Sequence, residues 1–213
     1  MVLKFYAAPR SPPAQLVAIT LHEKNIPFEF IEVNLLKGEH KLPGHLEKHP
    51  FGQVPVIDDD GFILYESNAI AQYLDEKYPS QGTKLIPTDF KKRALFNQAV
   101  FTETSSFSRY ASPLAFEVLF ISYFGGKTDP KKVEELTKNL TEKLDVYEQI
   151  LSKQKYLAGN ELTLADLQHI PFGTLLPQAG FNFTQNRPNV ARWFNELSSR
   201  KSWQKVKEEF GLA

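Results

Sequence analysis

The residues best suited to bind a small peptide lie in two neighbouring stretches, 49–57 and 64–70. The first reads His-Pro-Phe-Gly-Gln-Val-Pro-Val-Ile and predicts a turn followed by a strand that a proline opens. Proline donates no ladder hydrogen bond, so it is costly at the head of a strand. If the Val54–Pro55 bond is cis, it turns the Val54 N–H and C=O outward, toward a peptide-like ligand. The second stretch places Glu66 and Ser67 at a predicted helix start. An acid beside free backbone N–H groups there suits the amine and carboxylate of an amino acid.

Composition excludes several kinds of function. The 213 residues carry 25 Lys and Arg against 25 Asp and Glu, so the chain lacks the basic excess typical of nucleic-acid binding. It has no cysteines, which excludes disulfides, cysteine-ligated zinc and a thiol nucleophile supplied by the protein. No stretch approaches the roughly 20 apolar residues of a membrane span, and residues 1–5 lack the basic start of a secretory signal. We therefore expect a cytoplasmic protein with no nucleic-acid or membrane partner.

The first 80 residues alternate strand and helix signals, which predicts a small mixed α/β domain. Strands are expected at 3–7, 28–33, 54–58 and 62–65, with helices at 14–24 and from about 67 to 78. Residues 35–49 are rich in Lys, His and Gly and are expected to be irregular. Residues 81–89 are polar with Gly and Pro, and predict a linker.

Residues 90–213 predict an all-helical second domain. A long aromatic-rich helix is expected over 90–123, bent at Pro113, and a second follows the Asp129–Pro130 cap up to about residue 150. Thr163 and Asp166 form a capping-box pattern that opens another helix and are expected to have a structural role. Two more helices are expected at 188–200 and 202–210.

This layout resembles cytosolic glutathione transferases over the whole chain. The resemblance rests on PFGQVP (50–55), ESNAI (66–70) and the capping box, and is greatest to the phi class through Pro9-Arg10-Ser11, 38–41 and 83–86. It implies a thioredoxin-like domain at 1–80 that binds glutathione, a linker at 81–89 and an all-helical domain at 90–213. We predict from the same resemblance that the Val54–Pro55 bond, at the substrate edge of the first domain, is cis. It also implies conjugation of the glutathione thiolate to hydrophobic electrophiles, with glutathione as co-substrate, no further cofactor and a possible peroxidase side activity.

The resemblance assigns a role to eight residues of the first domain. Ser11 takes the position of the catalytic serine, whose hydroxyl would stabilise the thiolate. The others would bind glutathione: His40 and Lys41 its glycyl carboxylate, Gln53, Val54 and Pro55 its cysteinyl backbone, and Glu66 and Ser67 its γ-glutamyl group. Each of these eight residues also has a simpler structural interpretation, because a loop, the start of a strand or a helix cap would use the same residue types.

The residues near Ser11 suggest two alternatives to its catalytic role. Ser before Pro is also an ideal plain N-cap, so the local sequence alone favours a structural role for Ser11. Tyr6 is the rival, because other classes use a tyrosine near the end of this strand. Tyr6 lies three residues before Pro9, whereas that tyrosine lies two before its proline, so we interpret Tyr6 as a core or interface aromatic.

The electrophile pocket is expected to be apolar and to lie between the domains. Most aromatic residues of 90–123 are equally compatible with a core position. The candidates for the pocket are Pro12, Leu35, Phe107, Tyr110, Leu114 and Phe116.

A homodimer is expected, with Phe51 as its key. The turn at 49–52 is flanked by polar segments yet carries a large aromatic residue, which gains from burial in a partner's helical domain near 90–110 and 130–150. Phi-class plant proteins usually have arginine where this chain has Asn68, which leaves charge pairing at that interface open. The alternative is that Phe51 folds back onto its own domain.

Two further readings remain open from the sequence. His45 and His49 lie four apart and could chelate a metal, but without a third ligand nearby we expect a solvated loop and no metal. The same fold could also serve as a non-catalytic binding protein for aromatic small molecules, or as an interaction module like the transferase-like domains of translation factors. The complete set of glutathione-site residues favours the enzyme.

Overall fold

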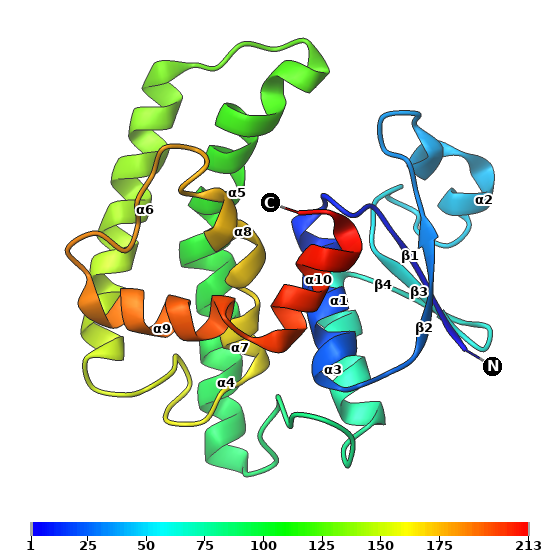
Figure 1. Ribbon diagram of the computed structural model, residues 1–213, viewed down its shortest axis with the longest axis horizontal. Coiled ribbons are helices and arrows are strands. Elements are labelled where there is room, and N and C mark those ends of the chain that lie inside the picture. The colour runs from blue at the N-terminus through cyan, green and yellow to red at the C-terminus, as the bar shows by residue number, and fades with distance from the viewer. Residues whose placement is uncertain (1, 213) are drawn as a thin grey trace. The chain divides into compact units, whose positions relative to one another are not determined.

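The computed structural model describes residues 2–212, which form two compact units (Figure 1). The first unit comprises the chain up to Ile86 together with the segment from Lys201 onward, and the second comprises Pro87–Arg200. The C-terminal helix therefore groups with the first unit, whereas the sequence placed it in the helical domain. Its pattern predicts a helix but not what that helix packs against.

The first unit contains a four-stranded mixed sheet in the order β2-β1-β3-β4. Strand β1 (Leu3–Ala7) pairs in parallel with β2 (Phe28–Glu32) and antiparallel with β3 (Val56–Asp59), which forms a hairpin with β4 (Phe62–Tyr65). Strand β3 begins at Val56, two residues later than expected, because Pro55 has no N–H to donate to the ladder.

Helices α1 (Pro12–Glu23) and α3 (Ser67–Lys77) cover one face of this sheet, and α10 (Lys201–Phe210) packs on α1 (Figure 1). Helix α1 is buried over most of its length because it has neighbours on several sides. The segment expected to be irregular contains a 3-10 turn, η1 (Glu39–Lys41), and the short helix α2 (Pro43–Leu46), which begins at a proline.

A buried ion pair fixes the end of this unit. Lys24 is fully buried, and its Nζ lies 2.8 Å from Asp75 Oδ1 and 3.1 Å from the Thr83 carbonyl. Asp75 also accepts hydrogen bonds from the backbone N–H groups of Leu85 and Ile86, each at 3.1 Å. Residues 83–86, expected to be a polar linker, are thus held against the first unit.

The second unit is helical throughout. Its elements are α4 (Phe90–Thr102), the π-helical segment η2 (Glu103–Ser108), α5 (Arg109–Ala115), a second π-helical segment η3 (Phe116–Phe120), the 3-10 segment η4 (Ile121–Phe124), α6 (Pro130–Leu151), α7 (Leu164–Leu167), α8 (Ile170–Leu175) and α9 (Pro188–Ser198). The predicted 90–123 helix is thus a continuous helical run with two π-helical segments. Pro113 lies between them, where it removes one backbone donor.

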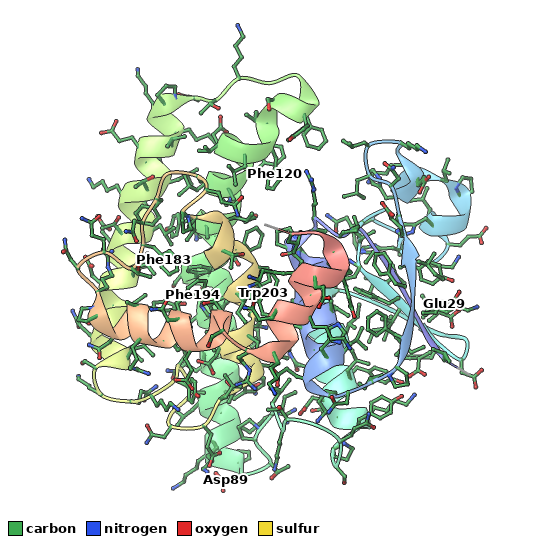
Figure 2. All side chains as sticks on the ribbon, in the orientation of Figure 1. Glu29, Asp89, Phe120, Phe183, Phe194 and Trp203 are labelled. Atoms are coloured by element: carbon green, nitrogen blue, oxygen red, sulfur yellow. The ribbon has the colours of Figure 1, made fainter. Side chains whose placement is uncertain are left out.

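Aromatic side chains and the capping box order the core of the second unit. Phe183 and Phe194 pack edge to face with centroids 4.8 Å apart (Figure 2). The predicted capping box opens α7, and Asp166 is fully buried there. Its carboxyl group accepts from Thr163 N (2.9 Å) and Oγ1 (3.0 Å), Leu157 N (2.9 Å) and Trp193 Nε1 (3.0 Å). Burial raises the pKa of this carboxyl group, and the four donors oppose that shift.

Within residues 2–212, no helix combines the length and the apolar character needed to cross a bilayer.

Candidate functional site

The first unit contains a cavity of about 440 Å³ where the starts of α1 and α3 meet the loops after β2 and before β3. All eight residues to which the sequence assigned a catalytic or peptide-binding role line it, as do three others, Pro13, Leu35 and Gly52. Its volume falls within the usual range for a small-molecule site. The eight are Ser11, His40, Lys41, Gln53, Val54, Pro55, Glu66 and Ser67.

Ser11 ends the β1–α1 loop at the N-terminus of α1. Its carbonyl accepts the first helical hydrogen bond, from Gln15 N at 3.0 Å, and its own N–H donates to the Ala8 carbonyl at 3.0 Å. Its side chain makes no capping hydrogen bond. The interpretation of Ser11 as a plain N-cap therefore lacks its defining contact.

The turn before β3 brings backbone groups to the cavity. The Val54–Pro55 bond is cis, as predicted, and Val54 precedes the first ladder residue of β3. Gly52 has φ of +59°, and a Cβ atom there would lie 2.8 Å from the His40 carbonyl, so this close turn requires glycine. The sequence assigned Gly52 no role in the site. The sequence feature that could have identified it is the Phe-Gly-Gln turn.

Glu66 and Ser67 form the opposite wall at the start of α3. Glu66 has φ of +73° and ψ of 110°, a conformation rarely adopted by a side-chain-bearing residue, and its side chain makes no capping bond. Ser67 is the first residue of the helix, so it lies beside first-turn N–H groups that have no partner within the helix. The pair places a carboxylate next to an anion-binding helix N-terminus, which is complementary to a zwitterionic amino acid.

His40 and Lys41 differ in charge. Burial lowers the pKa of His40, and the neighbouring Lys41 and His45 lower it further, so the imidazole is neutral at pH 7. Lys41 Nζ lies 3.0 Å from the Phe51 carbonyl and 2.8 Å from the Gly52 carbonyl. Lys41 is thus the cation available to an anionic ligand group, and it also holds the 49–52 turn in place.

The expectation of a solvated loop at His45 and His49 is wrong. His45 is 8% exposed and donates from Nε2 to the Gln53 carbonyl at 2.7 Å, while His49 is 2% exposed and stacks on Tyr65 with centroids 4.5 Å apart. The helical turn at Pro43–Leu46 brings both rings inward, which the sequence did not predict. Among the described residues, no group of three or more His, Cys, Asp or Glu side chains is placed to hold a metal ion.

Two of the proposed electrophile-pocket residues are corrected to the core. Phe107 is 1% exposed, with its ring 4.7 Å from His169, and Leu114 is fully buried. Phe107 lies in η2, which packs on α6, and Leu114 lies in α5, which packs on α6 and α8, so both belong to the interior of the second unit. Pro12 does not line the cavity described above, whereas its neighbour Pro13 does.

The remaining electrophile candidates have apolar surface available within their own units. Leu35 is 36% exposed and lines the cavity, and Phe116 is 40% exposed beside Phe124 at a centroid distance of 5.6 Å. Tyr110 is half-buried under the Arg109 guanidinium. Their contact with an electrophile stays a prediction.

Tyr6 lies outside the cavity lining. Its ring packs against Ala8, Val33 and Val54, and Lys48 Nζ lies over it at 5.4 Å. This environment matches the structural reading of Tyr6.

Phe51 occupies the tip of the 49–52 turn with 68% of its surface exposed. Its ring lies edge-on to those of His49 (centroids 6.1 Å apart) and Tyr65 (6.4 Å). In this chain it is not folded back into its own core.

A second cluster of titratable groups lies in the core of the second unit. Burial raises the pKa of Glu103 to about 7, although the Ser108 and Thr104 hydroxyls donate to its carboxylate. His169 donates from Nδ1 to the Ala165 carbonyl (2.9 Å) and accepts at Nε2 from the Tyr147 hydroxyl (3.1 Å). Burial lowers the pKa of His169 to about 3 and raises that of Tyr147, so both are neutral.

Comparisons with known proteins give a consistent picture. Residues 5–82 match the family described as Glutathione S-transferase, N-terminal domain, and residues 111–201 match Glutathione S-transferase, C-terminal domain. Glutathione S-transferase hmp2 of Hypomyces subiculosus is 41% identical over 213 residues, covering 98% of this chain and 99% of that protein. Glutathione transferase F7 of Populus trichocarpa superposes with a TM-score of 0.94 at 37% identity, covering all of both chains. The maize glutathione S-transferase I solved with an atrazine glutathione conjugate gives 0.88 at 32% identity, covering 99% of each chain.

Proposed function

Because this chain belongs to the glutathione S-transferase family, with its greatest resemblance to the phi class, we propose that Ser11 activates glutathione for conjugation to hydrophobic electrophiles. The observation that carries the proposal is the free Ser11 hydroxyl on the wall of a cavity complementary to a peptide. The alternative of a non-catalytic binding protein has no support from the relatives, which are named as transferases.

One hydroxyl group at a helix start can supply the free energy needed to ionise the glutathione thiol at neutral pH. A thiol with a pKa of about 8.5 is only a few per cent ionised at neutral pH, and lowering that pKa by two units requires about 2.7 kcal/mol. A hydrogen bond to a charged group contributes about 1.5–3 kcal/mol, and a helix N-terminus adds about 0.3–1 kcal/mol. In α1, Pro12 and Pro13 carry no N–H, so Ala14 supplies the first free donor of the helix beside Ser11.

Glutathione would bind with its three residues on three walls. Lys41, helped by a neutral His40, would bind the glycyl carboxylate, and the Val54 backbone would pair with the cysteinyl residue. Glu66 would bind the γ-glutamyl amine, and Ser67 with the α3 N-terminus its carboxylate. This order places the thiol at Ser11 and beside the apolar Leu35, where a hydrophobic electrophile can approach.

Ultraviolet titration of the bound thiolate tests the role of Ser11. Ser11→Ala should raise the thiol pKa by about 1–2 units, equivalent to ~1.5–3 kcal/mol, while glutathione still binds. Tyr6→Phe is the matched control, since it also removes one hydroxyl from the same β1–α1 region and should leave the pKa unchanged. An unchanged pKa in Ser11→Ala, or a shift in Tyr6→Phe, would transfer the role to the tyrosine.

We further propose a homodimer in which Phe51 enters the partner subunit. Burying one such ring removes ~150–250 Å² from water, about 4–6 kcal/mol per ring at roughly 25 cal/mol per Å² before association costs. In the second unit, helix α4 carries exposed apolar side chains that could receive it: Phe90 at 87%, Leu95 at 50% and Phe101 at 72% exposure. Asn68 leaves the charge pairing of this interface undefined.

Light scattering coupled to size exclusion tests the dimer. Wild type should elute at twice the chain mass, and Phe51→Ala should dissociate at concentrations where wild type does not. Phe62→Ala, which removes another half-exposed ring of the first unit, is the control. A wild-type monomer, or an equally tight Phe51→Ala dimer, would remove Phe51 from this role. A cytoplasmic location stays a prediction that cell fractionation would test.

A further inference from the structure

His45 lies behind one wall of the cavity at Ser11. It belongs to α2, is 8% exposed and is not among the residues that line the cavity. Its Nε2 lies 2.7 Å from the Gln53 carbonyl oxygen. A carbonyl can only accept a hydrogen bond, so Nε2 carries the proton and donates. Gln53 and Val54 both line the cavity, so His45 is bonded to the backbone of that wall.

This hydrogen bond fixes the direction of the Val54 N–H. The Gln53 carbonyl and the Val54 N–H belong to one planar peptide group, which is trans, since among the described residues only Val54–Pro55 is cis. In a trans peptide group the C=O and the N–H point to opposite sides. Holding the oxygen toward His45 therefore directs the Val54 N–H away from His45. Within residues 2–212 this N–H donates to no other group.

The imidazole of His45 is itself held in place. Its ring lies at 18° to that of His49 with centroids 6.4 Å apart, and His49 stacks on Tyr65 at 4.5 Å. The His45 N–H donates to the Leu42 carbonyl at 3.0 Å, and its carbonyl accepts from His49 N at 2.9 Å. The Nε2 donor thus has a defined position. Its hydrogen bond also polarises the peptide group, which makes the N–H at the far end a stronger donor.

We propose that His45 is a positioning residue for glutathione, which directs the Val54 N–H toward the cysteinyl carbonyl of the ligand. This inference rests on the proposed function, because it takes the Val54 backbone as the partner of the cysteinyl residue. The carbonyls of Phe51 and Gly52 are bound instead by Lys41 Nζ, at 3.0 and 2.8 Å. His45 is therefore the side chain that acts on the peptide group whose N–H is left for the ligand.

The competing interpretation is a purely structural bond that ties α2 to the turn before β3. The two interpretations differ in what they predict for ligands. Loss of a structural tie would loosen the whole wall and weaken every ligand of the cavity equally. Loss of a positioning residue would weaken only a ligand that has a cysteinyl carbonyl to accept from Val54.

Two ligands separate these interpretations by isothermal titration calorimetry. One is glutathione, and the other is its analogue in which an (E)-alkene replaces the Cys–Gly peptide bond. The analogue keeps the thiol, the γ-glutamyl group and the glycyl carboxylate but lacks the cysteinyl carbonyl. His45→Phe removes the donor and keeps a ring, and His49→Phe is the matched control at the neighbouring buried imidazole.

A second pair of variants guards against loss of folding in His45→Phe. His45→Gln and His45→Met have side chains of equal length, and only the first can donate to the Gln53 carbonyl. Thermal melts of every variant verify that it folds.

We expect His45→Phe and His45→Met to bind glutathione about tenfold more weakly than wild type, the effect of one hydrogen bond. Their affinity for the alkene analogue should stay close to that of wild type, and His45→Gln and His49→Phe should bind glutathione nearly as wild type does. In conjugation to 1-chloro-2,4-dinitrobenzene, His45→Phe should raise KM for glutathione by the same factor. Because Ser11 is unchanged, kcat and the pKa of the bound thiol should not move.

Equal losses for glutathione and its analogue, or no loss in His45→Phe and His45→Met, would make His45 a structural residue while the proposed function stands. If wild type binds no glutathione at all, the proposed function fails and this inference fails with it.

Discussion

The two units treat their polar groups in opposite ways. In the second unit, the carboxyl group of Asp166 is fully buried and accepts four hydrogen bonds from three residues. In the first unit, Ser11 and Glu66 stand at helix starts where a side chain usually caps, yet neither caps. A buried polar group whose partners lie within the chain stabilises the fold, and a polar group without such partners is a candidate for ligand contact. Polar side chains at helix starts are thus satisfied internally at Asp166 and make no capping hydrogen bond at Ser11 and Glu66.

The largest expected effect is on Asp166. Asp166→Ala leaves the buried donors Thr163 N and Trp193 Nε1 and the partly buried Leu157 N unpaired. Each unpaired donor costs about 1–3 kcal/mol, so the free energy of unfolding should fall by about 3 kcal/mol. Asp89→Ala is the control: Asp89 is an exposed N-cap of α4 that accepts from Lys91 N and Lys92 N, and its loss should cost about 1 kcal/mol (Figure 2).

Urea unfolding of both variants measures the difference. Should Asp166→Ala not fold, Asp166→Asn retains an acceptor and should show an intermediate loss. Equal costs for Asp166→Ala and Asp89→Ala would contradict the contrast between buried and exposed caps.

Glu103 is an exception in the second unit. The hydroxyl groups that donate to its carboxylate do not offset the effect of burial on its pKa. Its pKa is raised from 4.5 to about 7, so between these pH values the folded state binds more protons than the unfolded state. The contribution of Glu103 to stability should therefore be fully present below about pH 4.5 and should be lost as the pH rises to 7, by about 3 kcal/mol at most.

Glu103→Gln removes the titration while keeping an acceptor for Ser108. At pH 8 the variant should be more stable than wild type by about 3 kcal/mol at most, and at pH 4.5 the two should be nearly equal. Urea unfolding midpoints of the variant and wild type at the two pH values measure this difference in stability. Glu134→Gln, at an exposed position of α6, is the control. The assignment is wrong if the gain is the same at both pH values.

Glu66 tests whether the site carries backbone strain. Its φ of +73° is unfavourable for glutamate, and glycine adopts such values freely, so Glu66→Gly should stabilise the fold by about 1 kcal/mol. The same variant should lose glutathione binding. Asp60→Gly, at φ of +56° in the β3–β4 turn, is the control and should change little, since aspartate tolerates that region. A destabilised Glu66→Gly would show that the conformation is not strained.

The smallest expected effect is that of Ser11→Ala on stability. Since the Ser11 hydroxyl makes no capping hydrogen bond, Ser11→Ala should change the free energy of unfolding by less than about 0.5 kcal/mol. Loss of a working N-cap typically costs ~1 kcal/mol. Calorimetry compares it with Asp129→Ala, whose carboxylate accepts from Lys131 N at 2.9 Å. A loss equal to that of Asp129→Ala would make Ser11 a structural cap after all.

The sequence was most informative where local chemistry determines the conformation. The βαβ-ββα order and the Thr163–Asp166 box each depend on residues close together in the chain, and each is present. The cis Val54–Pro55 bond is also present, but its prediction followed from the family resemblance. The grouping of the eight site residues followed from the family resemblance, because their separation from position 11 to 67 gives no local signal.

The missed features depend on contacts distant in sequence. Burial of His45 and His49 depends on Gln53 and Tyr65, and the core position of Phe107 depends on His169. Periodicity identifies an apolar face but not whether it meets another helix or a ligand, so Phe107 and Phe116 looked equivalent until their neighbours were known. The π-helical segments likewise have no sequence signal that we recognised.

The return of α10 to the first unit sets the order in which the protein can be completed during synthesis. Residues up to Ile86 are made before the second unit, whereas the helix that packs on α1 is made after the whole of residues 87–200. Until then α1 lacks α10 and Phe30 lacks the neighbouring ring of Phe210. The first unit therefore cannot be completed until the second has been synthesised, and a nascent chain that has formed its second unit still exposes apolar surface of the first.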